Sequence, residues 1–180
     1  MRLTATCALA AALLAACNPQ PQHQPQATPS PTPQGVPPLK ITGHGTAGSP
    51  VRIVEQSRNR KLYELLARSY VSRSAQNVAQ ATFQQATVTF YDKDGTSLTA
   101  QAPQAAVDER TKRVTLTGGV RARTSAGATL TCDRLTYDRS TSLVNGEGNV
   151  RMTAAQNGTQ EVLTGNTFTS DINLTSMVMK

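Results

Sequence analysis

Few residues in this chain are of the types that perform acid–base, nucleophilic or metal chemistry, and they are widely spaced. The chain has two histidines, His23 and His44, and three cysteines, Cys7, Cys17 and Cys132. Their spacing fits no zinc-ligand pattern. A catalytic triad or dyad needs its base inside a folded region, whereas both histidines lie in linker-like sequence. The sequence therefore predicts no metal site, no cofactor and no enzymatic activity.

Cys17 is the cysteine with a defined chemical context. It follows an apolar run from Thr4 to Ala16, which is shorter than the ~20 residues of a membrane span and is typical of a secretory signal. Leu14-Ala15-Ala16-Cys17 matches the bacterial lipobox, in which a signal peptidase cuts before a cysteine that carries lipid. We expect residues 1–16 to be a lipoprotein signal peptide and Cys17 to be acylated. The alternative is a plain signal peptide that ends in cysteine.

Composition narrows the function classes further. The 180 residues carry a net charge of +7, but only 16% are charged and 4% are aromatic, with no tryptophan. So few charges exclude a coiled coil or a disordered polyampholyte. Excess positive charge favours a polyanionic partner or an anionic lipid surface. Nucleic acid is disfavoured, because the sequence shows neither aromatic stacking platforms nor a recognition helix.

A proline-rich segment follows the lipobox. Eight of the ten prolines fall between Pro19 and Pro38, with glutamine and threonine between them. Such a segment cannot bury enough apolar surface to fold and samples extended conformations. We therefore expect residues 17–50 to be the lipidated cysteine and a disordered tether, and residues 51–180 to be the folded domain.

From Val51 onward, apolar and polar residues alternate with a period of two, as in strands with one buried face. Glycine-containing turn signals punctuate the runs, and they are Asp94-Gly95, Gly118-Gly119, Asn145-Gly146 and Asn157-Gly158. Two further polar reversals open with Asp108 and Asp138. Short strands with frequent turns predict an antiparallel all-β domain. Residues 61–70 also fit a short amphipathic helix, although we favour a strand there.

A faint internal repeat links the two aspartate turns. Asp108, Thr111, Val114, Gly118, Val120 and Arg121 recur thirty residues later as Asp138, Thr141, Val144, Gly148, Val150 and Arg151. A third copy begins at Leu163 and places Asp171 at the turn. Repeated strand pairs stacked along one axis favour a stretched, jelly-roll-like pair of sheets with a lengthwise interior.

Several of these strand-and-turn patterns resemble one known family. The stretches are residues 62–70, 86–95, 98–105, 114–120, 130–138 and 146–150. They are similar to the lipopolysaccharide-transport periplasmic family, the OstA-like group that contains LptA and LptC. The resemblance implies an elongated, twisted antiparallel β-jelly roll over residues 51–180. It also implies a non-enzymatic protein of the cell envelope that faces the periplasm, binds lipopolysaccharide or a related glycolipid in an apolar groove, and relays it between membranes. The better-known LptC members are anchored by an N-terminal transmembrane helix, so the expected lipoprotein anchor follows from the lipobox and departs from the family pattern.

The resemblance also implies partners and a site. The partners are an inner-membrane lipopolysaccharide export ABC transporter and an LptA-type bridge protein, which would pair with the C-terminal edge strand in residues 171–180. The candidate groove residues are Val88, Phe90, Leu98, Val114, Leu116, Val120, Leu130, Val150, Met152, Phe168, Ile172 and Leu174. The candidate contacts to lipid phosphate at the groove mouth are Arg121, Arg123 and Arg151.

Other interpretations of the same residues stay open. The apolar candidates also fit ordinary core packing, and the arginines also fit a solvated face. The last strand also fits a tail that pairs inside its own domain. A structural or adhesive lipoprotein would keep the lipobox, tether and strands without a lipid groove. An LptA-like bridge is a further alternative to an LptC-like adaptor, although the tether favours the adaptor.

Overall fold

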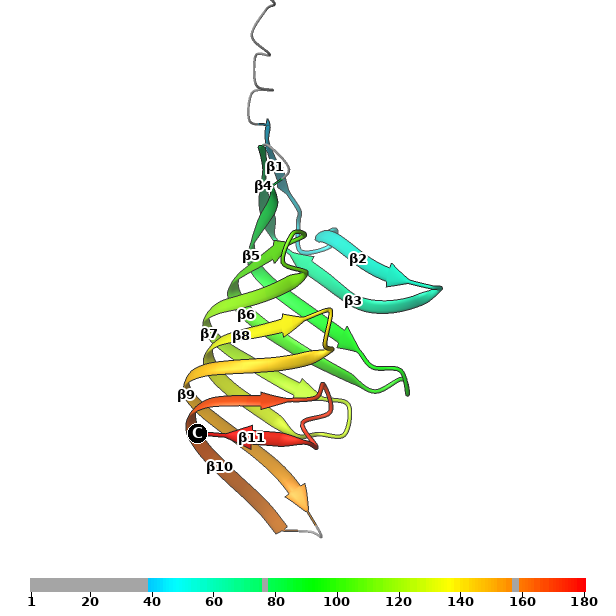
Figure 1. Cartoon of the computed structure of the whole chain (residues 1–180). Helices are drawn as coiled ribbons and strands as arrows, with labels where there is room; N and C mark the ends of the chain where they lie inside the picture. Colours follow the sequence, from blue (N-terminus) through cyan, green and yellow to red (C-terminus); the bar gives the residue numbers. More distant parts are fainter. Residues whose placement is uncertain (1–38, 76–77, 157–158) are drawn as a thin grey trace, which may run out of the picture. The chain divides into compact units, whose positions relative to one another are not determined.

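A computed structural model describes residues 39–75, 78–156 and 159–180. The predicted signal peptide, Cys17, the proline-rich part of the tether and the Asn157-Gly158 turn signal lie outside the described residues. Within the described part all regular structure is β-strand (Figure 1). The strands are β1 Leu39–His44, β2 Val51–Ser57, β3 Arg60–Ala67, β4 Ser69–Ala75, β5 Val78–Tyr91, β6 Ser97–Asp108, β7 Arg113–Thr124, β8 Thr129–Asp138, β9 Leu143–Gln156, β10 Thr159–Ser170 and β11 Met177–Met179.

The predicted all-β, jelly-roll-like fold is confirmed, with one change in its construction. The strands form one continuous antiparallel sheet in the order β1-β4-β5-β6-β7-β8-β9-β10-β11, instead of a pair of sheets. β3 pairs with β5 beside β4, and β2 pairs with β3. Residues 61–70 are strand, as favoured from the sequence, with a break at Arg68 between β3 and β4.

The predicted boundary of the tether is wrong at its C-terminal end. β1 lies inside the segment predicted to be disordered, and it pairs with β4 from Leu39↔Ser74 to His44↔Ser69. The proline-rich run ends at Pro38 and β1 contains no proline, so every residue of β1 can donate a backbone hydrogen bond, and Leu39 and Ile41 alternate with Lys40 and Thr42. β1 forms because β4 offers an edge with which it can pair. Its own alternation is too short to predict a strand from the sequence.

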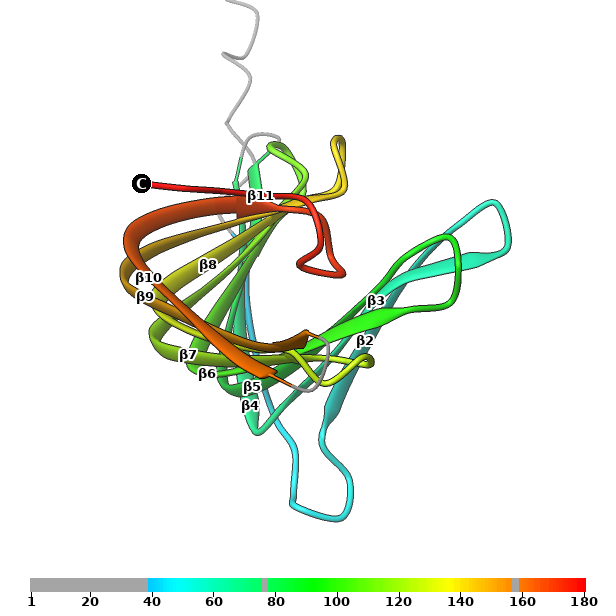
Figure 2. The same ribbon diagram turned by 90° about the horizontal axis from the view of Figure 1, so that it is seen from below.

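A line of irregularities crosses the sheet from β5 to β10. Register shifts lie between Gln101 and Gln104, between Thr117 and Val120, between Thr131 and Arg134, and between Gly165 and Thr167. Positive φ angles mark the same level in β5 at Gln85 and in β9 at Gly148 and Asn149. Bulges bend a strand and increase its twist, so neighbouring bulges form one crease, where the long strands curve together (Figure 2).

The crease divides the sheet into two arms. Arm A contains residues 86–91, 97–102, 120–124, 129–132, 150–156 and 159–165, together with the β2–β3 hairpin. Arm B contains residues 78–84, 104–108, 113–117, 134–138, 143–147 and 167–170, together with β1, β4 and β11. The inner faces of the arms pack together and form the core.

Two of the predicted tight turns are wrong. Gly118-Gly119 lies inside β7, where positive φ values of 94° and 90° form the bulge of the crease. Asn145-Gly146 lies inside β9 and pairs with both β8 and β10. In each case apolar alternation continues on both sides of the glycine, and the space above Gly146 is occupied by the ring of Phe168.

The aspartate turns of the repeat are formed as predicted. Asp108 Oδ1 accepts hydrogen bonds from the N–H groups of Arg110 and Thr111, at 2.9 and 3.1 Å. Asp138 Oδ1 accepts one from Ser140 N at 2.9 Å, and Asp171 Oδ1 accepts one from Thr175 N at 2.8 Å. Asp108 and Asp138 end strands of arm B, and Asp171 directly follows one, so the repeat places successive turns along one border of the sheet.

We predict that Gly146→Ala destabilises the domain, because an added Cβ overlaps the Phe168 ring in the packed interior. The expected loss is about 1–3 kcal/mol in the free energy of unfolding, the usual range for overpacking. Urea unfolding followed by circular dichroism measures it. Gly48→Ala is the control, because nothing lies within 4 Å of its added Cβ. Equal stability of the two variants would contradict the strand assignment of Gly146.

Cys132 provides a second test of the packed interior. Its side chain faces the core, and the residue is 4% exposed. Burial, followed by the charge of Asp133, raises the pKa of its thiol to about 11. We expect a Cys7→Ser/Cys17→Ser protein to react with a thiol reagent at pH 8 at least roughly 100-fold more slowly when native than in urea, because the thiolate is the reactive form. Similar native and unfolded rates would show that this part of the core is open.

Candidate functional site

The apolar interior between the arms is the candidate functional site. The residues predicted to line a groove all lie in it and are at most 5% exposed, and they are Val88, Phe90, Leu98, Val114, Leu116, Val120, Leu130, Val150, Met152, Phe168, Ile172 and Leu174. The structure therefore brings the whole predicted set into one cluster. In this conformation their side chains fill the space between the arms.

Sequence reasoning missed interior residues that lie beyond the crease. Phe83 is buried together with Val88 although their positions have opposite parity, and Leu135 and Tyr137 are buried together with Leu130. In β5, β6 and β8 the irregularity at the crease shifts the alternation by one residue, so the inward-facing parity reverses there, whereas β7 and β9 keep the same parity on both sides. The register shifts of β6 and β8 are the signal that accounts for this change.

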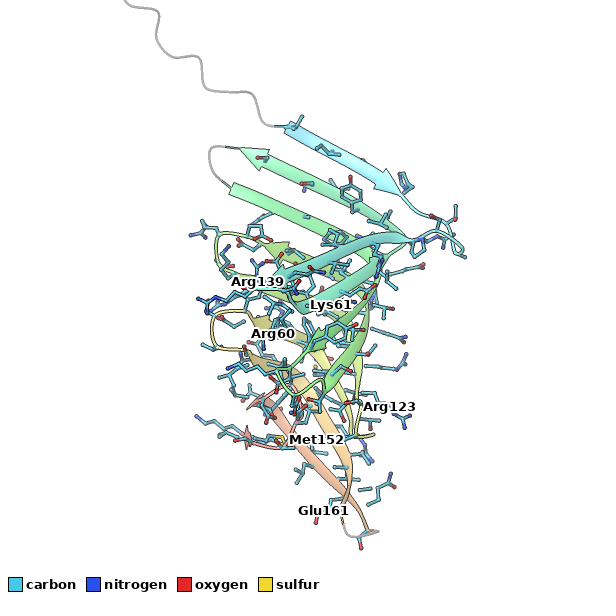
Figure 3. All side chains as sticks on the ribbon, turned by 90° about the vertical axis from the view of Figure 1, so that its right-hand side faces the viewer. Arg60, Lys61, Arg123, Arg139, Met152 and Glu161 are labelled. Atoms are coloured by element: carbon cyan, nitrogen blue, oxygen red, sulfur yellow. The ribbon has the colours of Figure 1, made fainter. Side chains whose placement is uncertain are left out.

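The interior opens at the C-terminal end of the sheet. A hollow of about 350 Å³ is lined there by Met152 and Ala154 of β9, Leu163 of β10, and Leu174 and Met177 near the chain end. Met152 pairs with Leu163, and Ala154 pairs with Glu161, so these side chains share the inner face. Figure 3 shows Met152 and Glu161 at this lower end of the sheet. An apolar surface here is continuous with the core.

The C-terminal strand can be interpreted from the sequence either as a docking edge for a partner or as a tail that pairs inside its own domain, and it partly fits both. β11 pairs with β10 from Phe168↔Met179 to Ser170↔Met177, so one of its edges is satisfied inside the domain. The loop before it buries Ile172 and Leu174 in the core. In the described part of the chain no strand pairs with the other edge of β11. Val178, which is 63% exposed, lies on this terminal strand.

The three candidate arginines do not lie where we expected them. Arg121 pairs with Thr131, and Thr131 pairs with Arg151 on the next strand. The side chains of Arg121, Arg123 and Arg151 are all exposed on the outer face of arm A. Arg121 and Arg123 line an outer hollow of about 520 Å³ whose other lining residues are mostly serine, threonine and glutamine. The expected position at the groove mouth is therefore wrong, because the alternation that buries Val120 and Ala122 turns these arginines outward.

The border opposite the crease is closed by a buried arginine that the sequence analysis did not single out. We call this border the seam. Arg139, in the β8–β9 turn of arm B, forms ion pairs with Glu55 of β2 at 3.2 Å and with Glu109 of the β6–β7 turn at 2.9 Å. Only 5% of the Arg139 side chain is exposed. Figure 3 shows Arg139 beside the β2–β3 hairpin. The Glu55–Arg139 pair therefore joins arm A to arm B.

The environment of Arg139 is aromatic as well as charged. Tyr63 lies beside it on β3, and Phe90 lies 6.4 Å from Tyr63 and 4.5 Å from Tyr137 between ring centroids. Burial raises the pKa of Tyr63 to about 12, so this phenol is neutral. Burial acts to lower the pKa of Arg139, but the hydrogen bond and charge of Glu109 outweigh it, and the pKa is raised. Arg139 is therefore a permanent buried cation.

A second polar contact closes the seam nearer the C-terminal end. Asn173, in the loop before β11, contacts the hydroxyl of Thr96 and donates a hydrogen bond to Asp92 Oδ2 at 3.3 Å. Thr96 and Asp92 belong to the β5–β6 turn of arm A, whereas Asn173 belongs to arm B. Among the residues that the structure describes, the hydrogen bonds and ion pairs across the seam are made by side chains, whereas the crease is held by the continuous backbone.

The outer face of the β2–β3 hairpin carries a separate ionic cluster. Glu64 lies between Arg52 and Lys61, and Lys61 Nζ lies 5.1 Å from the ring centre of Tyr91. The hydrogen bonds from Arg52 and Lys61 lower the pKa of Glu64 to about 2. In the described residues, no group of three or more His, Cys, Asp or Glu is placed to hold a metal ion. No helix there is long and apolar enough to cross a membrane.

Comparison with known proteins identifies a family. A family model described as LptC, lipopolysaccharide-assembly, LptC-related, matches residues 6–179. A search of curated proteins finds no match. The family model covers nearly the whole sequence, including every strand of the sheet. The chain therefore belongs to the LptC-related lipopolysaccharide-assembly family, whose members are cell-envelope components of lipopolysaccharide transport.

Proposed function

We propose that this protein binds lipopolysaccharide, or a related amphiphilic glycolipid, between its two arms and relays it from one membrane toward another without a chemical step. The observation that carries the proposal is the continuous apolar interior that opens at the C-terminal hollow. Each exposed CH₂ of an acyl chain costs about 0.8 kcal/mol in water. Several chains therefore need an apolar sheath, and an elongated inner face of medium aliphatic side chains provides one.

The anchor and the partners belong to the same proposal. Acylated Cys17 and the proline-rich tether would hold the domain at a membrane while leaving it free to reach partners. The inner-membrane lipopolysaccharide export ABC transporter would deliver the lipid. An LptA-type bridge protein would add a strand to the free edge of β11 and so extend the apolar interior, since strand addition satisfies unpaired backbone groups.

One observation favours a second function. The interior is filled by its own side chains, many of them less than 1% exposed, as expected for a structural or adhesive β-domain with no lipid groove. The two functions differ in what the inner face touches in the cell. A lipid carrier must part its arms, whereas a structural domain has no reason to do so.

A pair of neighbouring residues tests lipid contact. Leu163 and Val162 are both exposed apolar residues of β10, 42% and 44% exposed, but Leu163 faces inward beside Met152 and Val162 faces outward. We expect a photo-crosslinking amino acid at Leu163 to label lipopolysaccharide in cells and the same residue at Val162 not to do so. Equal labelling would remove the argument for an inner lipid path, and absence of labelling at both would favour the structural function.

The docking of a bridge protein is tested at the free edge. We expect Val178→Lys to weaken pull-down of an LptA-type partner by roughly tenfold, because a charged edge residue opposes strand pairing, while the thermal midpoint stays unchanged. Leu143→Lys is the control, since Leu143 is 37% exposed but lies on β9, between two paired neighbours. Equal loss of binding in both variants would argue against docking at β11.

A further inference from the structure

The way in which the arms are joined indicates how a lipid can enter, and this inference rests on the proposed function. The backbone is continuous across the crease in β5, β6, β7, β8, β9 and β10. An acyl chain needs space that the filled interior lacks, so the arms must separate. The crease is the hinge of such a movement, because bending there breaks no strand pairing. The contacts that must break lie along the seam.

Arg139 is the charged group at the centre of those contacts. Its Nη1 atom meets Glu55 of arm A, and its Nη2 atom meets Glu109 of arm B. When the arms part, Glu109 moves together with Arg139, whereas Glu55 moves away with the β2–β3 hairpin. The 95% buried guanidinium would then lose a counter-charge beside the aromatic residues Tyr63 and Tyr137, which is costly unless another anion replaces it.

The guanidinium also has an unused donor. Arg139 Nε is buried and has no hydrogen-bond partner among the described residues. Buried donors of this kind are rare in folded proteins, and an unsatisfied one points to a missing acceptor. The Nε–H of an arginine points to the same side as Nη2, so Nε and Nη2 can together bind two oxygens of a phosphate side by side. Glu109 meets Nη2 through a single carboxylate oxygen, so one N–H of Nη2 and the N–H of Nε remain for such an acceptor.

We propose that Arg139 is a binding residue for the anionic headgroup of an amphiphile that enters sideways through the seam. The headgroup phosphate binds Nε and the second N–H of Nη2 side by side, and its charge replaces that of the departing Glu55. The acyl part lies on the inner face beside Phe90 and Tyr137, and the remaining polar part of the ligand stays outside the seam. Glu55 is thus both the closing contact of the seam and the competitor of the ligand.

The arginines of the outer face do not offer the same site. Arg121, Arg123 and Arg151 are exposed and lie on the side of the sheet opposite the interior. An amphiphile whose chain is buried between the arms reaches the seam but not that face. Arg123→Gln is therefore a matched control for loss of one positive charge.

Binding of two probes with the same chain length separates headgroup from chain recognition. Dodecyl phosphate is anionic, and dodecyl maltoside is uncharged. Titration calorimetry uses the full chain with Cys17→Ser, so that no protein-bound lipid competes. We expect Glu55→Gln to bind dodecyl phosphate roughly fivefold more tightly than the parent protein does, because it removes the competing carboxylate of a partly exposed ion pair. Binding of dodecyl maltoside should change much less.

A second variant keeps the positive charge of residue 139 and removes its pair of neighbouring N–H donors. Arg139→Lys should weaken dodecyl phosphate binding by at least roughly tenfold and abolish the gain from Glu55→Gln, since an ammonium group cannot make the side-by-side contact. Thermal midpoints of all variants show whether the domain stays folded. Arg123→Gln should leave binding of both probes unchanged. Inorganic phosphate, as a competitor of dodecyl phosphate, should bind far more weakly than the amphiphile.

Different failures have different meanings. Unchanged or weaker dodecyl phosphate binding in a folded Glu55→Gln protein would show that the ion pair is purely structural and overturn the inference. If every variant bound both probes equally, the inference would also be overturned, but the proposed lipid binding would stand. If Arg123→Gln lost as much dodecyl phosphate binding as Arg139→Lys, binding would depend on general surface charge and the inference would fail. Binding of neither probe by any version would overturn the proposed lipid function together with this inference.

Discussion

The packing of one folded sheet against itself is the constraint on which the rest of this structure depends. A single antiparallel sheet with one apolar face must bury that face, and here it does so by creasing along a line of bulges. The crease brings Phe90 of arm A to 4.5 Å from Tyr137 of arm B, between ring centroids. Every inner residue thus contributes to the stability of the domain, and the proposed lipid path runs along the same residues.

This double use goes together with a contrast between the crease, which runs inside the sheet, and the seam, where the two arms meet. The crease is held by covalent backbone and by hydrogen-bonded strand pairs, whereas the seam is held by Glu55–Arg139, by Asn173 and by aromatic packing. Side-chain contacts can exchange partners at modest cost, but a broken strand ladder leaves several buried backbone groups unpaired. A sheet built in this way is held less firmly along the seam than along the crease.

The two ends of the sheet differ in a similar manner. At the N-terminal end β1 pairs with β4, and Leu39 and Ile41 remain exposed at 59% and 46%. At the C-terminal end β11 has a free edge, and the inner face opens at Leu163. Exposed apolar groups beside unpaired strand edges are aggregation liabilities unless partners cover them. Both ends therefore present exposed apolar groups at strand edges that no other described strand pairs.

The sequence by itself determined the all-β class, the aspartate turns and much of the inner face, because alternation and Asp-led turns are local properties of the chain. It also sufficed for the family resemblance, since the family's motifs are the same strand and turn patterns. It did not determine β1, because a short strand outside the main pattern depends on the pairing capacity of β4. Nor did it place Gly146 inside a strand, since that position depends on the ring of Phe168.

Tertiary structure alone decided the crease and the seam. The reversal of parity between Val88 and Phe83 depends on bulges aligned across neighbouring strands, and no single strand encodes that alignment. Arg139 is an ordinary turn residue in sequence, next to Asp138. It becomes a buried cation only because residues distant along the chain, Glu55 and Glu109, meet it across the seam. Long-range pairing, instead of local preference, created the chemistry of that border.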